Sequence, residues 1–202
     1  MTMKPFTTVS GAAAPLLLPD VDTDTISPAH SGRRDPAASV FAPLRYRADG
    51  TDDPDFVLNR PAFRGAPILL CGANFGCGSS RETAVWSLAA IGVRCLVAPS
   101  FGDIFAGNCF QNGMLPIVLD AATIERIAAV AADGSTVVVD LESQTIVTAG
   151  GVRVEFTVDA LRRAQLLAGL DDIALTLTRH DEIVAFQTVD RGRRPWIYET
   201  NP

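Results

Sequence analysis

The chain has 202 residues, of which 48% are hydrophobic and 20% are charged, and its formal net charge is −6. This length is enough for a domain with a buried core. The acidic balance, with no basic stripe interleaved with aromatic residues, argues against a nucleic-acid partner. No apolar run approaches the length that spans a membrane, and residues 1–6 lack the apolar segment of a secretory signal. We therefore expect a cytoplasmic protein that makes no contact with membranes.

The cysteines give no sign of a metal site. They occur at positions 71, 77, 95 and 109, form no C-x-x-C pair, and have neither His30 nor His180 close by in the sequence. Zinc sites and iron–sulfur clusters need tighter ligand spacing than this. The sequence therefore predicts free thiols in a reducing compartment, and no metal or cluster bound by this chain.

Residues 27–61 form the first distinctive segment. Prolines at 28, 36, 43, 54 and 61 alternate there with glycine and aspartate. This composition predicts a long irregular loop with at most short ordered pieces. A loop of that length inside a compact domain is usually either functional or disordered, and we assign it to contact with a substrate or a partner.

The middle of the chain alternates between two patterns. Short apolar runs at 67–71, 93–98 and 115–119 predict buried strands. The segments between them, 81–91 and 102–110, predict helices. Strands and helices that alternate at this spacing indicate parallel βαβ units.

The last third has a different pattern. A helix is expected at 123–131, ending near Gly134, and then residues 136–141 and 145–156 predict strands paired as hairpins. Two further helices are expected at 158–167 and 172–186, with a possible break near His180. The predicted fold class is therefore α/β: one domain over residues 1–202, with a parallel core sheet, an antiparallel annex and flanking helices.

The segment GANFGCGSSRE, residues 72–82, carries the chemistry. Its glycines let the backbone approach a ligand closely. Ser79 with Glu82 fits a capping box, so either Ser79 or Ser80 is expected to cap the helix that follows. Arg81 then falls in the first helical turn, where the helix dipole is already positive and a cation is unfavourable without an anion. Helix amides, hydroxyls and a guanidinium together predict a carboxylate or phosphate site, with a solvated surface arginine as the plain alternative.

Two common anion-binding motifs do not fit. A nucleotide-binding P-loop requires a lysine before its Ser or Thr, and Gly78 is followed by Ser79, Ser80 and Arg81. The dinucleotide motif requires a third glycine at the position that Arg81 occupies. Nucleotide binding is therefore a remote alternative.

The segment NFGCGSSRE, residues 74–82, resembles the signature of the swivelling domain of the aconitase superfamily, in its isopropylmalate dehydratase form. The resemblance extends in order along most of the chain, through VDTDTI at 21–26, DFVLN at 55–59, APSFGDIF at 98–105, NGMLP at 112–116, and GLDDI with LTL between 169 and 177. Ordered blocks of this kind are far more specific than a single glycine-rich loop.

The resemblance implies a swivelling β/β/α domain that docks onto a large subunit. That partner would hold a [4Fe–4S] cluster acting as a Lewis acid, and this chain would bind no cofactor. The implied reaction interconverts 2-isopropylmalate and 3-isopropylmalate by dehydration and rehydration, in leucine biosynthesis. By the same resemblance Ser79 is the catalytic base, Ser80 and Arg81 hold a carboxylate of a small dicarboxylate substrate, and Thr23 and Asp24 lie at the rim of the site. Acidic turn residues or a helix cap would explain Thr23 and Asp24 equally well.

The chain departs from the family pattern at two places. Family members commonly carry histidine where this chain has Thr83, which cannot shuttle a proton near neutral pH. The expected substrate-specificity loop, His30, Ser31, Gly32, Arg33 and Arg34, lacks the aromatic and leucine residues that suit an isopropyl group. Three functions therefore stay open: the isopropylmalate enzyme or a paralogue for another substituted malate, a separate phosphate- or nucleotide-binding domain, and a non-catalytic assembly subunit.

Overall fold

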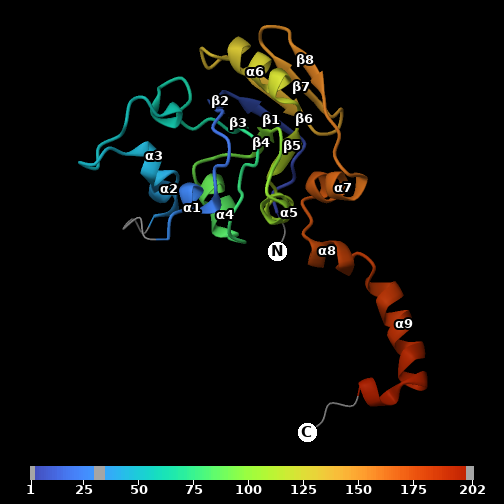
Figure 1. Ribbon diagram of the computed structural model, residues 1–202. Coiled ribbons are helices and arrows are strands. Elements are labelled where there is room, and N and C mark those ends of the chain that lie inside the picture. Colours follow the sequence, from blue (N-terminus) through green and yellow to red (C-terminus); the bar gives the residue numbers. More distant parts are fainter. Residues whose placement is uncertain (1–2, 30–34, 199–202) are drawn as a thin grey trace.

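Two four-stranded sheets form the centre of the molecule, as Figure 1 shows. This computed structural model describes residues 3–29 and 35–198. The parallel sheet has the order β2 (Ala13–Leu16), β3 (Ile68–Cys71), β4 (Cys95–Ala98) and β5 (Leu115–Val118). The sequences ILLC and CLVA of its two central strands are fully buried, as expected for parallel strands covered on both faces. The prediction of a parallel core sheet is confirmed.

The second sheet is antiparallel. Its order is β1 (Thr8–Gly11), β6 (Val137–Asp140), β7 (Thr145–Thr148) and β8 (Arg153–Glu155). Burial alternates along β6, so that Val137 and Val139 face the core. This is the predicted annex, with its two hairpins.

Strands β1 and β2 were missed by the sequence prediction. They follow one another directly, and the chain changes sheets at Ala12. Alanine and proline are poor strand formers, so residues 12–15 carry little strand signal. Pro15 is tolerated because β2 is an edge strand, where one backbone N–H can be missing.

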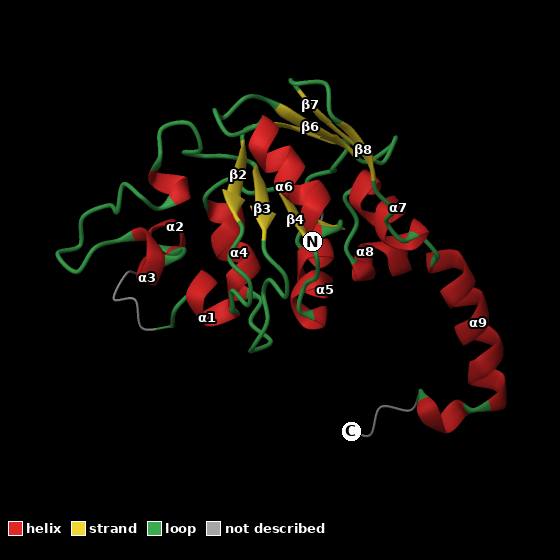
Figure 2. Cartoon of the chain, turned by 45° about the horizontal axis from the view of Figure 1, so that its top comes forward, coloured by secondary structure: helices red, strands yellow, loops and turns green. Residues whose placement is uncertain are grey.

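Helices cover both faces of the parallel sheet. On one face α1 (Thr23–Ile26), α4 (Thr83–Ala90) and α5 (Asp103–Gln111) enclose an apolar cluster that includes Ile26, Leu88 and Phe105. On the other face, α6 (Ala121–Val130) and the antiparallel sheet enclose a second cluster. Figure 2 shows the resulting layers, and the predicted β/β/α fold class is confirmed.

The segment 27–61 is irregular, as predicted, in its described part. It contains only the short helices α2 (Pro36–Ser39) and α3 (Ala42–Arg45) and the 3₁₀ turn η1 (Val57–Asn59). Asn59 anchors it, because its Nδ2 donates to the carbonyls of Arg45 at 2.7 Å and Asp53 at 2.8 Å. These bonds hold the segment together, and α2 packs against α4 of the body.

Three helices end the chain: α7 (Ala160–Ala168), α8 (Asp172–Leu177) and α9 (His180–Arg193), followed by the 3₁₀ turn η2 (Pro195–Ile197). The expected break near His180 is present, although α9 continues further than predicted. Figures 1 and 2 both show α9 extending away from the body. Among the described residues, no helix combines the length and apolar composition needed to cross a bilayer.

Candidate active site

Three loops meet at the carboxyl edge of the parallel sheet, following β2, β3 and β4. The amide of Gly76 donates to the carbonyl of Val21 at 2.7 Å, and the amide of Thr23 donates to the carbonyl of Cys77 at 3.0 Å. The amide of Phe75 donates to the carbonyl of Ser100 at 3.1 Å. The Asp-Thr-Asp motif and the glycine-rich motif are therefore joined backbone to backbone, at the edge where open α/β sheets bind ligands.

The glycines of the β3–α4 loop permit this close approach. Gly76 has φ +74°, and a Cβ placed on it would lie 2.2 Å from the ring of Phe105. A Cβ on Gly72 would lie 2.3 Å from the carbonyl oxygen of Leu18. Neither position has room for a side chain.

Asn74 braces the loop from outside. Its φ is +58°, its Nδ2 donates to Oδ1 of Asp20 at 2.8 Å, and its amide donates to Oγ of Ser100 at 2.8 Å. These bonds tie together the loops that follow β2, β3 and β4. Asn74 therefore supports the loop through both its side chain and its backbone amide.

The Asp-Thr-Asp motif supports the serine turn. Asp22 caps α1 by accepting from the Thr25 amide at 2.6 Å, and the hydrogen bonds from Thr25 lower the pKa of the Asp22 carboxyl. The Thr23 side chain is buried, with 1% of its surface exposed, and its Oγ1 donates to the Ser79 carbonyl at 3.1 Å. This geometry makes Thr23 a positioning residue for the Ser79 main chain.

Arg81 reaches across to the same motif. Its Nη1 forms an ion pair with Oδ1 of Asp24, and the two side chains keep 35% and 52% of their surface exposed. Ser79 and Ser80 are exposed beside them. The predicted residues Ser79, Ser80, Arg81, Asp24 and Thr23 therefore lie on two segments that the fold brings together.

The predicted capping box is wrong. Helix α4 begins at Thr83, its N-cap is Glu82, and no side chain bonds the cap. Ser79 instead lies in a tight turn in which the Arg81 amide donates to its carbonyl at 2.8 Å. The serines and Arg81 thus precede the helix, and both hydroxyls are left for other partners.

A hollow of about 240 Å³ opens beside this turn, lined by Gly76, Cys77, Gly78, Ser79, Gly102, Asp103, Ile104 and Phe105. Half of its lining residues, Gly78, Ser79, Asp103 and Ile104, are exposed, so the hollow is open to solvent. A ligand held there would be shielded from water only if a second surface covered the hollow.

Proteins of known name are similar to this chain over almost its whole length. The model of the aconitase C-terminal domain matches residues 3–122, and the LeuD_N model matches residues 125–160. A 3-isopropylmalate dehydratase small subunit from Paramagnetospirillum magneticum is 48% identical over 96% of this chain and 100% of its own length. A protein of the same name from Cupriavidus necator is 50% identical over 97% and 99%. The solved 3-isopropylmalate dehydratase structure from Methanocaldococcus jannaschii is 28% identical, with a TM-score of 0.65 over 88% of this chain and 99% of that one.

The chain belongs to the 3-isopropylmalate dehydratase small-subunit family. This confirms the resemblance seen in the sequence and makes the protein a subunit of a hydro-lyase in the aconitase superfamily. The relatives favour neither a nucleotide-binding domain nor a non-catalytic subunit.

Three of the four thiols of this chain are poorly suited to hold an iron–sulfur cluster. Cys71, Cys95 and Cys109 are buried, and burial raises the pKa of each thiol, which disfavours the thiolate that binds iron. Within residues 3–29 and 35–198, no three histidine, cysteine, aspartate or glutamate side chains are grouped to hold a metal ion.

Of the two places where the sequence departs from the family pattern, the structure describes one and not the other. Thr83 is exposed at the first position of α4, next to the serine turn. The specificity loop, His30, Ser31, Gly32, Arg33 and Arg34, lies outside the described residues, so its role stays a prediction.

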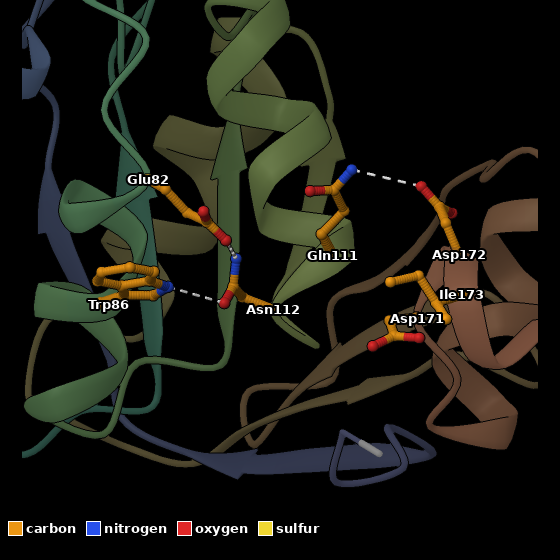
Figure 3. A pocket seen from close by; sticks show the side chains of 7 residues that line it. All are labelled: Glu82, Trp86, Gln111, Asn112, Asp171, Asp172 and Ile173. Carbon is orange, nitrogen blue, oxygen red and sulfur yellow. Dashed lines mark hydrogen bonds between the residues drawn. The ribbon is translucent and has the colours of Figure 1, made fainter. Parts of the chain in front are cut away.

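One feature of this family member was missed by the sequence analysis. Glu82 is held by Asn112, whose Nδ2 donates to Oε1 at 2.9 Å, while Trp86 Nε1 donates to Oδ1 of Asn112 at 3.0 Å. Figure 3 shows this network on one wall of a pocket of about 440 Å³, with Gln111 and Asp172 bonded on the opposite side. The network links the start of α4 to the end of α5, and Glu82 directly follows Arg81 in the sequence. The NGMLP block that contains Asn112 was noted only for its resemblance.

Proposed function

We propose that this chain is the small subunit of 3-isopropylmalate dehydratase, which interconverts 2-isopropylmalate and 3-isopropylmalate by dehydration and rehydration in leucine biosynthesis. One observation carries the proposal: the exposed Ser79–Arg81 turn is held against Thr23 and Asp24 at the open edge of the sheet. The relatives compared, all named for this enzyme, favour it over a paralogue for another substituted malate.

Ser79 is the proposed base that removes the proton α to a substrate carboxylate. A serine hydroxyl is a weak base, so its alkoxide needs stabilisation by several kcal/mol from nearby positive charge. Arg81, two residues further along the same turn, is the proposed source of that charge. The main chain of Ser79 is fixed from two sides, because its carbonyl accepts from both Thr23 Oγ1 and the Arg81 amide.

Ser80 and Arg81 are proposed to bind a substrate carboxylate. The guanidinium has five N–H donors, and Asp24 engages only Nη1. The pair is exposed, and such ion pairs contribute about 0–1 kcal/mol. A carboxylate bound by two parallel hydrogen bonds can therefore displace Asp24 or bind beside it.

A large subunit is the proposed partner, and the [4Fe–4S] cluster is assigned to it. The names of the relatives call them small subunits, and the hollow at Ser79 needs a cover. Departure of the substrate hydroxyl falls to that partner, and no residue of this chain is assigned to it. We place the complex in the cytoplasm.

Replacing the base tests the proposal. Ser79→Ala, co-expressed with the large subunit of the same organism and reconstituted anaerobically, is expected to lower kcat by about 10²–10⁴-fold. Ultraviolet absorbance of the unsaturated intermediate follows the reaction. The control is Ser10→Ala, which removes an exposed hydroxyl on β1. Full activity of the Ser79 variant would exclude Ser79 as the base.

Arg81→Lys tests the carboxylate site separately. A lysine keeps the charge but loses the planar fork, so KM should rise and kcat should fall, with kcat/KM lower by about 10–100-fold. Arg126→Lys is the matched control, because Arg126 is exposed on α6, the helix that covers the other face of the parallel sheet from α1 and α4. A kcat/KM equal to that of the control would rule out the proposed contact.

A further inference from the structure

Exposed large apolar side chains gather at the carboxyl-terminal end of the chain. We call residues 172–197, which comprise α8, α9 and η2, the C-terminal arm. The exposed apolar residues on this arm and on the adjoining α7 are Leu161, Ile173, Leu177, Val184, Phe186, Val189, Trp196 and Ile197. Large apolar side chains gathered on one exposed segment indicate an interaction site where they form a patch, and Leu161 and Phe186 line the same groove.

A groove of about 770 Å³ runs between α7, α8 and α9. Its apolar lining comes from Leu161, Leu175, Ile183 and Phe186. The side chain of Phe186 keeps 63% of its surface exposed. The rest of the lining is polar and consists of Thr176, Arg179, Glu182, Gln187 and Tyr198. Apolar side chains together with polar ones are the usual composition of a protein interface.

Specific bonds order the arm. Asp190 is buried on α9 and accepts from Nε of Arg194 at 2.7 Å and from the hydroxyl of Tyr198 at 3.0 Å. These bonds fold η2 back onto α9. Yet α9 has 14 residues, and helices of that length are marginal in water without packing on an apolar face. The arm is built for contact with a further surface.

The direction of the arm indicates what that surface is. In Figures 1 and 2, α1, α4 and α5 lie along the lower edge of the body, and α9 extends beyond them. Figure 2 shows the arrows of β2 and β3 pointing to this same edge, where the site opens. A protein that covers the site therefore approaches the side on which the arm projects.

We propose that the groove between α7, α8 and α9 receives an apolar segment of the large subunit. This inference rests on the proposed function. The partner is then held at two places, the site edge and the arm. A second copy of this chain is the weaker choice, because pairing through the arm alone would leave the hollow at Ser79 uncovered.

Charge placed in the groove tests the inference. Phe186→Asp and Ile183→Asp should each weaken binding of the full-length chain to the large subunit by about tenfold or more, measured by titration calorimetry. Thr188→Asp is the matched control, since Thr188 is exposed on α9 and does not line the groove. Far-ultraviolet circular dichroism and the unfolding midpoint establish that each variant folds.

The outcomes separate this inference from the function itself. If wild type binds and turns over while both groove variants bind as tightly as Thr188→Asp, the groove assignment is overturned and the proposed function stands. If sedimentation shows that Phe186→Asp only dissociates copies of this chain from one another, the groove serves self-association and the inference is also overturned. Slower amide hydrogen exchange of α9 in the wild-type complex than in the free chain supports the groove assignment.

Discussion

At the scale of single residues, the site depends on a backbone that passes too close to its neighbours for any side chain. Gly76 combines a positive φ of +74° with the ring of Phe105 at 2.2 Å from where a Cβ would lie. Gly76→Ala should therefore destabilise the fold by about 2–4 kcal/mol, the sum of left-handed strain and overpacking. Urea denaturation of the purified chain measures this.

Gly107→Ala is the matched control for that prediction. Gly107 lies within α5, and a Cβ placed on it meets nothing within 4 Å. Alanine there should stabilise the chain by about 0.5–1 kcal/mol, because it restricts the unfolded state. Equal effects of the two substitutions would show that the loop does not need its glycine.

The residues proposed to bind substrate were easier to predict than those that support them. The glycines, the serines and Arg81 indicated an anion site by themselves, whereas the roles of Ser79 and Asp24 were implied by the resemblance to the family. The position of Thr23 depends on contacts across 56 residues of sequence, and only the fold reveals that its hydroxyl holds the Ser79 carbonyl. The same holds for Asn112, which reaches Glu82 from 30 residues away.

At the scale of elements, the predictions succeeded where burial leaves a periodic pattern. The buried runs of β3, β4 and β5 and the helices between them were found because each is continuous and apolar. The predicted start of α4 was wrong. The serines fit a capping box by spacing alone, but hydrogen bonds to the Ser79 carbonyl hold them in a turn outside the helix. Strand β2 was missed because its pairing with β3 outweighs the weak strand preference of its alanines.

Helix α1 shows how one capping carboxylate links stability to pH. The hydrogen bonds from Thr25 lower the pKa of Asp22 below its ordinary 3.8. A carboxyl with a depressed folded pKa stabilises the fold above its unfolded pKa, and this contribution is lost as pH falls through the folded value. The free energy of unfolding should therefore decrease below about pH 4.

Asp22→Asn isolates that contribution. Asparagine is an equally good N-cap, so stability near pH 7 should change by less than about 0.5 kcal/mol while the decrease below pH 4 becomes shallower. Urea midpoints from pH 7 to 3 provide the measurement, with Asp181→Asn on exposed α9 as the control for loss of one charge. Parallel acid profiles for wild type and Asp22→Asn would contradict the assignment.

At the scale of the whole molecule, the parallel sheet separates two sealed cores and leaves one edge open. Cys71 and Cys109 belong to one core and Cys95 to the other, and all three are buried. Cys77 is partly exposed and lines the hollow beside Ser79. The four thiols therefore report on both cores and on the open edge.

In the native chain a maleimide should label only Cys77, and the other three thiols should react once urea unfolds both cores. Partial burial and the carboxylates of Asp22 and Asp20 raise the pKa of Cys77 above its ordinary 9.0, so its labelling rate should keep increasing as pH rises through 9. Mass spectrometry counts the labels.

The proposed partner covers this edge, so adding the large subunit should slow the labelling of Cys77. Unchanged labelling in a complex that is shown to form would place the partner elsewhere on the molecule.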